Sequence, residues 1–161
     1  MSEPTYRIVR AADVEPAALR AYVREAWHGE VVIAHGDAYR PAEHDGFVAL
    51  DAERIAGHAS YRLQDGGAEL TAIVVAPRHE GIGSRLLERV VEVARAHGCA
   101  RLVVTTTNDN VDALRFYQRR GFRLVAVRAG AVDEARVMKP EIPEIGSYGI
   151  PMRDEIDLEL D

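Results

Sequence analysis

The sequence predicts an α/β fold of mixed α+β character, with a central mixed sheet of about six to seven strands flanked by helices. Short runs that alternate apolar with polar residues indicate strands, and longer runs with apolar residues at helical spacing indicate helices. Between residues 70 and 128 the two patterns alternate, which indicates parallel strands, whereas the earlier strands follow one another through tight turns. The chain has 161 residues, with no repeat and no shift in composition, so we expect one domain over residues 1–161.

The first half of the chain predicts antiparallel strands preceded by one helix. Residues 5–10 alternate like a strand, and Asp13 followed by Pro16 opens a helix that ends at about Trp27. Residues 28–46 show no sustained period, so we expect a long connection with room for one short helix. Three strands follow at 47–50, 54–63 and 68–76, joined by tight turns at 51–53 and 64–67.

The second half carries the strongest helical pattern. Apolar residues recur at helical spacing over 82–97, and Gly98 stands at the expected C-cap position. The β-branched run LVVTTT at 102–107 predicts a strand, after which Asn108 and Asp109 can cap a helix that reaches Arg120. Further strands are expected at 122–128 and 153–160, separated by an irregular, proline-containing segment at 139–149.

Composition and charge restrict the class of protein. The chain is 47% hydrophobic and 29% charged, which is typical of a globular protein rather than a disordered one. Its formal net charge of −6 disfavours non-specific nucleic-acid binding and weakly favours cationic partners. No run approaches the roughly 18 apolar residues of a membrane span, and the N-terminus lacks a signal-peptide pattern. We therefore expect a cytoplasmic protein with neither nucleic-acid nor membrane partners.

The cysteine and histidine residues predict neither a disulfide nor a metal site. Cys99 is the only cysteine, so an internal disulfide is excluded. The six histidines show no ligand spacing such as HExxH, and a thiolate metal site would need more cysteines. We therefore expect no metal.

The junction VVAPRHEGIGSRLL at 74–87 can bind an anion. A strand here passes through a glycine-bearing turn into a helix, so backbone N–H groups of residues 78–84 can face one concavity at the positive end of a helix. Gly81 and Gly83 would let a pyrophosphate approach the backbone closely, and ordinary turn chemistry is the alternative. The chain contains no GxxxxGK[ST], and GIGSRL lacks the third glycine of GxGxxG, which disfavours P-loop proteins and nucleotide dehydrogenases.

Two motifs in the second half point to one family. Residues 75–83 read VAPRHEGIG, and residues 110–122 read NVDALRFYQRRGF. The first resembles motif A of the GNAT acyltransferase superfamily, V-x-P followed by [RQ]xxGx[GA], although the commoner spacing has two more residues between Pro77 and Arg78. The second resembles motif B, NxxAxx[FL]YxxxGF, at every marked position. The resemblance covers about residues 50–128 and implies the GNAT fold, with a CoA-binding core over about 70–122.

The resemblance implies acetyl-CoA as cosubstrate and a set of residues that bind it. The pantetheine arm would hydrogen-bond the strand at 73–75 as an added strand, and divergence of that strand from LVVTTT would open the slot. Asn108 and Asn110 would contact CoA from the start of the second helix, with helix capping as the alternative. The expected cofactor-binding residues are Ile73, Val74, Val75, Arg78, His79, Glu80, Gly81, Ile82, Gly83, Ser84, Asn108 and Asn110.

The reaction implied is direct attack of a neutral amine on the acetyl carbonyl, with a strand N–H near Val75 polarising the carbonyl oxygen. Tyr117 lies one turn beyond Ala113 on the same helix face, where its phenol could protonate the departing thiolate. Without the family match, an aromatic residue at this spacing would be read as core.

Glu69 is the expected general base, because it begins the strand that diverges and shares a face with Thr71. His58 and Tyr61 on the neighbouring strand are weaker choices, and a water chain could replace all three. Ordinary solvation of Glu69 at the end of a hairpin is equally compatible with the sequence.

The chain is therefore expected to be an enzyme, an acetyl-CoA-dependent N-acetyltransferase that acts on a small-molecule amine or a peptide amine. The alternative is a CoA-binding sensor without catalysis, and the presence of Tyr117 and Asn110 favours the enzyme. The acceptor side should come from residues 28–46 and 128–153, neither of which carries a readable motif. A homodimer supported by the apolar tail around Ile145 is left open.

Overall fold

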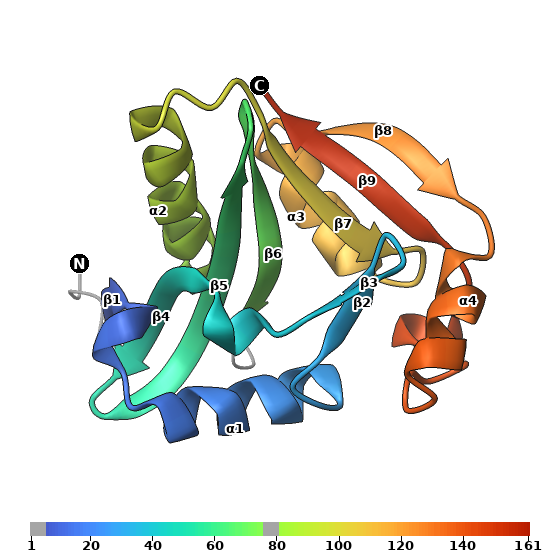
Figure 1. Ribbon diagram of the computed structural model, residues 1–161, viewed down its shortest axis with the longest axis horizontal. Helices are drawn as coiled ribbons and strands as arrows, with labels where there is room; N and C mark the ends of the chain where they lie inside the picture. The colour runs from blue at the N-terminus through green and yellow to red at the C-terminus, as the bar shows by residue number, and fades with distance from the viewer. Residues whose placement is uncertain (1–5, 76–80) are drawn as a thin grey trace.

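The computed structural model describes residues 6–75 and 81–161, which form a seven-stranded mixed sheet flanked by helices (Figure 1). The strand order is β1-β4-β5-β6-β7-β9-β8, and β2 pairs with β3 in a separate ribbon. The strands are β1 (Tyr6–Arg10), β2 (Val32–Ala34), β3 (Asp37–Tyr39), β4 (Asp45–Asp51), β5 (Arg54–Gln64), β6 (Gly67–Val75), β7 (Leu102–Thr107), β8 (Arg123–Arg128) and β9 (Glu155–Leu160). The helices are α1 (Pro16–Trp27), α2 (Ile82–Ala96), α3 (Val111–Arg119) and α4 (Ala131–Met138), with 3-10 turns at Ala11–Asp13, Pro41–Glu43 and Ser147–Gly149. The predicted mixed sheet is confirmed.

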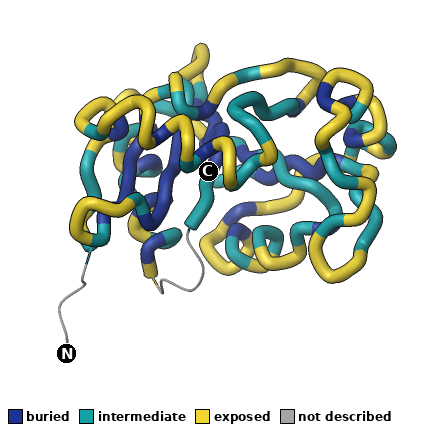
Figure 2. The backbone as a smooth tube through the Cα atoms, turned by 90° about the horizontal axis from the view of Figure 1, so that it is seen from below, coloured by how far each residue is buried: buried dark blue, intermediate teal, exposed yellow. Residues whose placement is uncertain are grey.

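The two faces of β4 and β5 pack against different helices. Gly57 of β5 lies so close to α2 that an added Cβ would be 2.8 Å from Ile82 Cγ2. On the opposite face, Val48 of β4 packs with Val23 of α1. Alternate residues of a strand point to opposite faces, so β4 and β5 each contribute to both cores. Figure 2 shows the buried residues concentrated along the strands, with exposed outer faces on the helices.

The parallel pairing of β6 with β7 is short, and the site depends on it. These strands are hydrogen-bonded only from Ala68↔Leu102 to Leu70↔Val104. Beyond that point they diverge, as Figure 1 shows for the two arms of the sheet. On its other edge β6 stays paired with β5 as far as Val75, and the expected divergence from LVVTTT is therefore present.

Two regions for which no regular element was predicted contain strands or a helix. Residues 28–46 were expected to form a long connection, yet they hold the β2–β3 ribbon, whose turn places His35 at φ 55° and Gly36 at φ 74°. Three-residue strands are too short to show a period, which is why the pattern was missed. Helix α4, with Val132 and Ala135 buried, was likewise not predicted, and its short length hides its amphipathic spacing.

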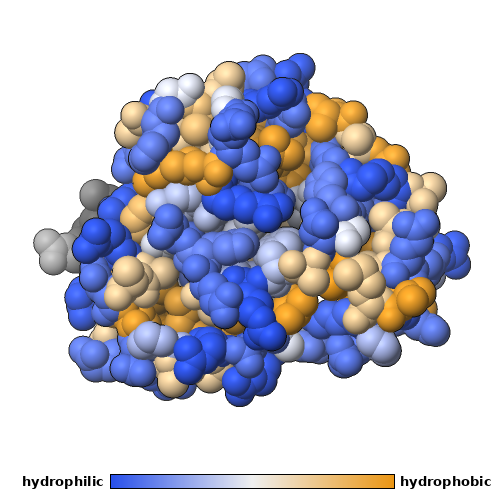
Figure 3. Space-filling model, viewed as in Figure 1, coloured by the Kyte–Doolittle hydropathy of each residue, from blue (hydrophilic) through white to orange (hydrophobic). Residues whose placement is uncertain are grey.

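The outermost strand, β8, exposes apolar side chains at the edge of the sheet. Leu124, Val125 and Val127 are all exposed there, and Ile145 is exposed in the tail. Figure 3 shows several separate hydrophobic patches on a mostly hydrophilic face rather than one continuous patch. A homodimer therefore stays a prediction.

Candidate active site

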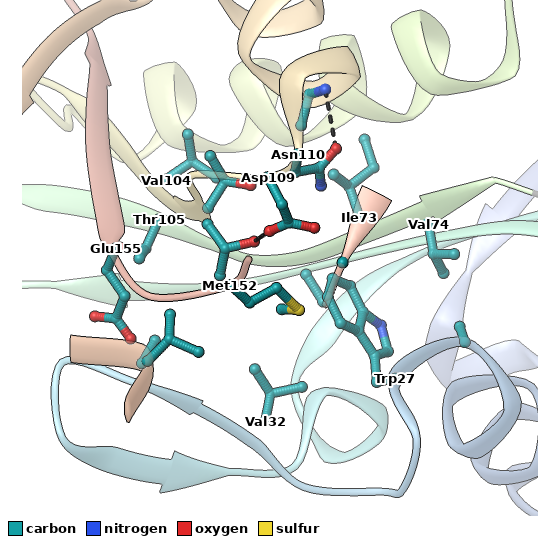
Figure 4. Close-up of a pocket in the computed structure, with 18 of the residues that line it drawn as sticks. Trp27, Val32, Ile73, Val74, Val104, Thr105, Asp109, Asn110, Met152 and Glu155 are labelled. Atoms are coloured by element: carbon teal, nitrogen blue, oxygen red, sulfur yellow. Dashed lines mark hydrogen bonds between the residues drawn. The ribbon is translucent and has the colours of Figure 1, made fainter. Parts of the chain in front are cut away.

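The divergence of β6 from β7 opens a pocket of about 800 Å³. Its walls come from the ends of β6 and β7, the start of α3, the β2–β3 ribbon and the tail that follows α4. Figure 4 shows labelled side chains from these elements, including Ile73, Asn110 and Met152, around the same space. The pocket thus joins the expected CoA slot to the two segments expected to form the acceptor side.

The β6 segment contributes an open strand edge to this pocket. Ile73, Val74 and Val75 all line it, and each is paired with β5 on the other side. Because the partner strand β7 has diverged, the edge of β6 that faces the pocket can accept hydrogen bonds from a bound extended chain. The expected position for a pantetheine arm is therefore available.

The N-terminus of α2 lies next to this edge. Gly81 is the N-cap residue, at φ 84°, and no side chain of the described residues caps the helix, so the amides of Ile82, Gly83 and Ser84 are available to an anion. Gly83 lines the pocket. The Ile82 side chain is completely buried in the core, so its contribution to binding is restricted to the backbone. Arg78, His79 and Glu80 lie outside the described residues.

Arg120 brings a positive charge to the same helix end. Its Nε donates to Ser84 Oγ at 3.1 Å, and its Nη2 donates to the same oxygen. The guanidinium also stacks 3.8 Å from the centre of the Phe116 ring, which fixes its plane. The helix N-terminus and this guanidinium together make a site suited to a phosphate group.

Asn110 and Asn108 have different positions. Asn110 lines the pocket, and its Oδ1 accepts the Ala113 N–H at 3.2 Å, so it caps α3 while its amide nitrogen stays available. Asn108 lies outside the pocket wall, where its Nδ2 donates to Pro151 O and its Oδ1 accepts the N–H groups of Arg153 and Asp154. Asn108 therefore holds the tail in place, and this placement does not favour the expected CoA contact.

Tyr117 lies in the wall of the pocket and in the main core. It is buried against Phe116 and Phe122, with ring centres 5.4 and 5.3 Å away. Burial raises the pKa of the Tyr117 phenol well above its usual value. The phenol therefore stays protonated at neutral pH, as a proton donor must.

Glu69 is held outside the pocket. Its carboxylate accepts hydrogen bonds from Arg62 Nε at 2.8 Å and Gln64 Nε2 at 3.1 Å. Glu69 lies outside the pocket because it is still paired with Val103 of β7, and the two strands diverge only after Leu70. Glu69 does not line the pocket, so its position does not favour a role as the base.

Three buried charged residues of the pocket wall were not predicted as site residues, although Asp109 was expected to cap a helix: Asp109, Lys139 and Glu155. Asp109 accepts from Thr107 Oγ1 and from the Ser147 amide, while Lys139 donates to the carbonyls of Trp27 and Val31. A signal for Glu155 was present, since residues 155, 157 and 159 are acidic and alternate with apolar ones, which puts three acids on one strand face. No group of three or more His, Cys, Asp or Glu side chains within the described ranges is arranged to hold a metal.

Asp109 also explains a glycine in the tail. A Cβ at Gly146 would lie 2.1 Å from Asp109 Oδ2 and 2.6 Å from Met152 Cγ. The tail can therefore reach the Asp109 carboxylate, and donate the Ser147 amide to it, only with glycine at position 146. This contact holds the tail against Asp109, so that both form part of the pocket wall.

His58 makes the folded state sensitive to acid. It is completely buried on β5, and neither ring nitrogen has a hydrogen-bond partner among the described residues. Burial, with a smaller effect from His44, lowers the pKa of His58 from 6.5 to about 4. The unfolded chain thus takes up a proton at a higher pH than the folded chain does, so stability is full above about pH 6.5 and falls as the pH approaches 4.

We expect acid to cost the wild type ~3 kcal/mol more than a His58→Leu variant between neutral pH and about pH 4. Urea unfolding of both proteins across this range measures the difference. The lowered pKa of His44 adds to the slope of both proteins and cancels in the comparison. Parallel stability curves for the two proteins would contradict this account of His58.

The comparisons with known proteins place the chain in a family. A model described as the acetyltransferase (GNAT) family matches residues 8–122, and the chain belongs to this family. It is 41% identical over 128 residues to YdhI of Bacillus subtilis, covering 79% of each chain, and 34% identical over 150 residues to YxbD of the same organism, covering 92% of this chain and 94% of YxbD. Both of these relatives are described as uncharacterized.

A solved structure confirms the fold. A GNAT family acetyltransferase from Elizabethkingia anophelis, with acetyl-CoA bound, superposes with a TM-score of 0.71 at 21% identity and covers 99% of both chains. The chain is thus an acetyltransferase of the GNAT family by sequence and by fold. No helix in residues 6–75 and 81–161 is long and apolar enough to cross a bilayer.

Proposed function

We propose that this protein transfers the acetyl group of acetyl-CoA to a primary amine by direct attack in a ternary complex. The observation that carries the proposal is the pocket at the divergence of β6 and β7, which brings a free strand edge, a helix N-terminus and the Tyr117 phenol to one space. Acetyl-CoA bound to the similar Elizabethkingia protein supports the same ligand here.

The residues present fit an extended acyl-CoA. The open edge of β6 at residues 73–75 would hold the amides of the pantetheine arm, and the amides of Gly83 and Ser84 would hold the pyrophosphate. Asn110 offers a free amide group beside that arm. Acetyl-CoA supplies the activated thioester, while the chain supplies alignment, exclusion of water and a proton donor.

Direct transfer needs the amine nitrogen to reach the thioester carbonyl and the sulfur to leave as a thiol. A strand N–H near Val75 would hydrogen-bond the carbonyl oxygen as negative charge develops there. The protonated phenol of Tyr117 would then donate to the departing sulfur. The proton lost by the amine leaves through water or a base, and Glu69 is a poor candidate for that base because Arg62 and Gln64 already occupy its carboxylate.

A thiol-release assay tests the proposal. Purified protein is incubated with acetyl-CoA and a panel of primary amines, and free CoA is followed with a thiol reagent. We expect thiol release that depends on the amine, with the acetylated amine identified by mass spectrometry. Binding of acetyl-CoA without turnover on any amine would instead support the non-catalytic sensor.

A further inference from the structure

Glu155 is a buried carboxylate in the wall of the acceptor side of the pocket. It is the first residue of β9, opposite Thr107 of β7, and its side chain is only 4% exposed. Figure 4 shows it on the side of the pocket opposite Trp27, next to Thr105. It therefore lies beside the diverging end of β7, away from the β6 edge that is suited to pantetheine.

One oxygen of Glu155 accepts both hydrogen bonds that the described residues donate to this side chain. Its Oε1 accepts from Arg128 Nη2 at 2.7 Å and from the His35 amide at 3.1 Å. Its Oε2 has no hydrogen-bond partner among residues 6–75 and 81–161. Oε2 is not one of the fully buried side-chain atoms that lack a partner, and Glu155 lines the pocket, so this oxygen can accept a hydrogen bond from a group that enters it.

Glu155 shares its positively charged partner with a second carboxylate. Arg128 also donates to Asp157, so a single guanidinium serves two carboxylates. Asp157 accepts Thr105 Oγ1 at 2.7 Å as well, and burial of this carboxyl is outweighed by the bonds from Arg128 and Thr105, so its pKa is lowered. One guanidinium therefore faces two carboxylates, with His35 Nε2 3.2 Å from Asp157 Oδ1, and a cationic group in the pocket would add a positive charge beside Glu155.

Apolar side chains line the same pocket. Val32 and Ile33 of the β2–β3 ribbon and Ile142 and Met152 of the tail line the pocket together with Glu155. A ligand that reaches Glu155 therefore places one charged group against the carboxylate and an apolar body against these side chains.

We propose that Glu155 binds the amino group of the acceptor through Oε2, and that the acceptor is a primary amine carried on an apolar body. This inference rests on the proposed function. Glu155 then sets the position of the amine and the choice of substrate, because its carboxylate favours a cation over a neutral or anionic molecule of the same shape.

The test compares two variants that remove the same charge from the same cluster. Glu155→Gln keeps Oε1 for Arg128 and for the His35 amide, and changes only the group that faces the pocket. Asp157→Asn is the matched control, because it shares Arg128 but does not line the pocket. Thermal melting and calorimetric titration with acetyl-CoA confirm that both variants fold and bind the cosubstrate.

Steady-state kinetics with 2-phenylethylamine and ethanolamine give the readout, since the two amines differ in the polarity of the body. For the wild type we expect a lower KM for 2-phenylethylamine. Glu155→Gln should raise that KM at least 10-fold, as loss of a charged hydrogen bond does, and leave the KM for acetyl-CoA unchanged. Asp157→Asn should change the amine KM less than about threefold.

Failure of this inference can be told apart from failure of the proposed function. An active wild type whose amine KM is the same in Glu155→Gln, or shifts equally in both variants, overturns the role of Glu155 alone. A lower KM for ethanolamine overturns the apolar acceptor. A wild type that acetylates no amine in a broad panel overturns the proposed function and this inference with it.

Discussion

A Tyr117→Phe variant is expected to lose kcat by about 100- to 1,000-fold and to bind acetyl-CoA as the wild type does. The substitution removes only the phenol oxygen, while the ring keeps its packing against Phe116 and Phe122. Burial keeps the Tyr117 phenol protonated throughout the neutral range, so the lost oxygen is the lost proton donor. Steady-state kinetics together with calorimetric titration separate the chemical step from binding.

The control for Tyr117→Phe is Tyr148→Phe. Tyr148 is exposed, donates to Asp112 and does not line the pocket, so removal of its hydroxyl should leave kcat unchanged. If Tyr117→Phe retained more than half of the wild-type kcat, the thiolate would be leaving without help from Tyr117. The residue would then be part of the core and nothing more.

A Gly83→Trp variant is expected to weaken acetyl-CoA binding at least 100-fold. A Cβ at position 83 would already lie 3.3 Å from Phe116 Cε2 and 3.5 Å from Val75 Cγ2, so the indole has to extend into the pocket that Gly83 lines. There it would cover both the amides of α2 and the edge of β6.

The matched control is Ala96→Trp, an exposed position in the last turn of the same helix. It adds the same side chain far from the helix N-terminus and should bind acetyl-CoA as the wild type does. Melting curves confirm that both variants are folded. Equal affinity of Gly83→Trp and Ala96→Trp would place the cosubstrate somewhere other than this pocket.

Much of the fold could be predicted because the pattern that determines it is local. The apolar spacing over 82–97 is long enough to identify α2, and the alternating runs on either side identify the strands that α2 connects. Tyr117, Asn110 and Gly83 line one pocket, because the two motifs occupy the elements next to the diverging strands, and their roles there stay predictions.

The acceptor side could not be predicted, since it depends on contacts between distant segments. Glu155 reaches Arg128 on the neighbouring strand and the His35 amide, 120 residues away in the chain. No periodicity in a single segment encodes such a meeting. The short strands of the β2–β3 ribbon, which carry His35 to this position, fall below the length at which a pattern can be recognised.

The surroundings of Glu69 depend on the residue at which β6 leaves β7. The face of the strand was judged from its period of two, but the point at which β6 leaves β7 cannot be read from a single strand. Because divergence begins only after Leu70, Glu69 remains beside a paired strand and within reach of Arg62. One or two residues along a strand thus decide whether a carboxylate faces a cavity or an ion pair.

Calorimetric titration of the wild-type protein with acetyl-CoA, repeated with Gly83→Trp, tests most directly whether the pocket between β6 and β7 is an acetyl-CoA site. We predict micromolar binding at one molecule per chain for the wild type, lost in Gly83→Trp and retained in Ala96→Trp. Absence of binding by the folded wild type, or unchanged binding by Gly83→Trp, would contradict the assignment of this pocket as the acetyl-CoA site.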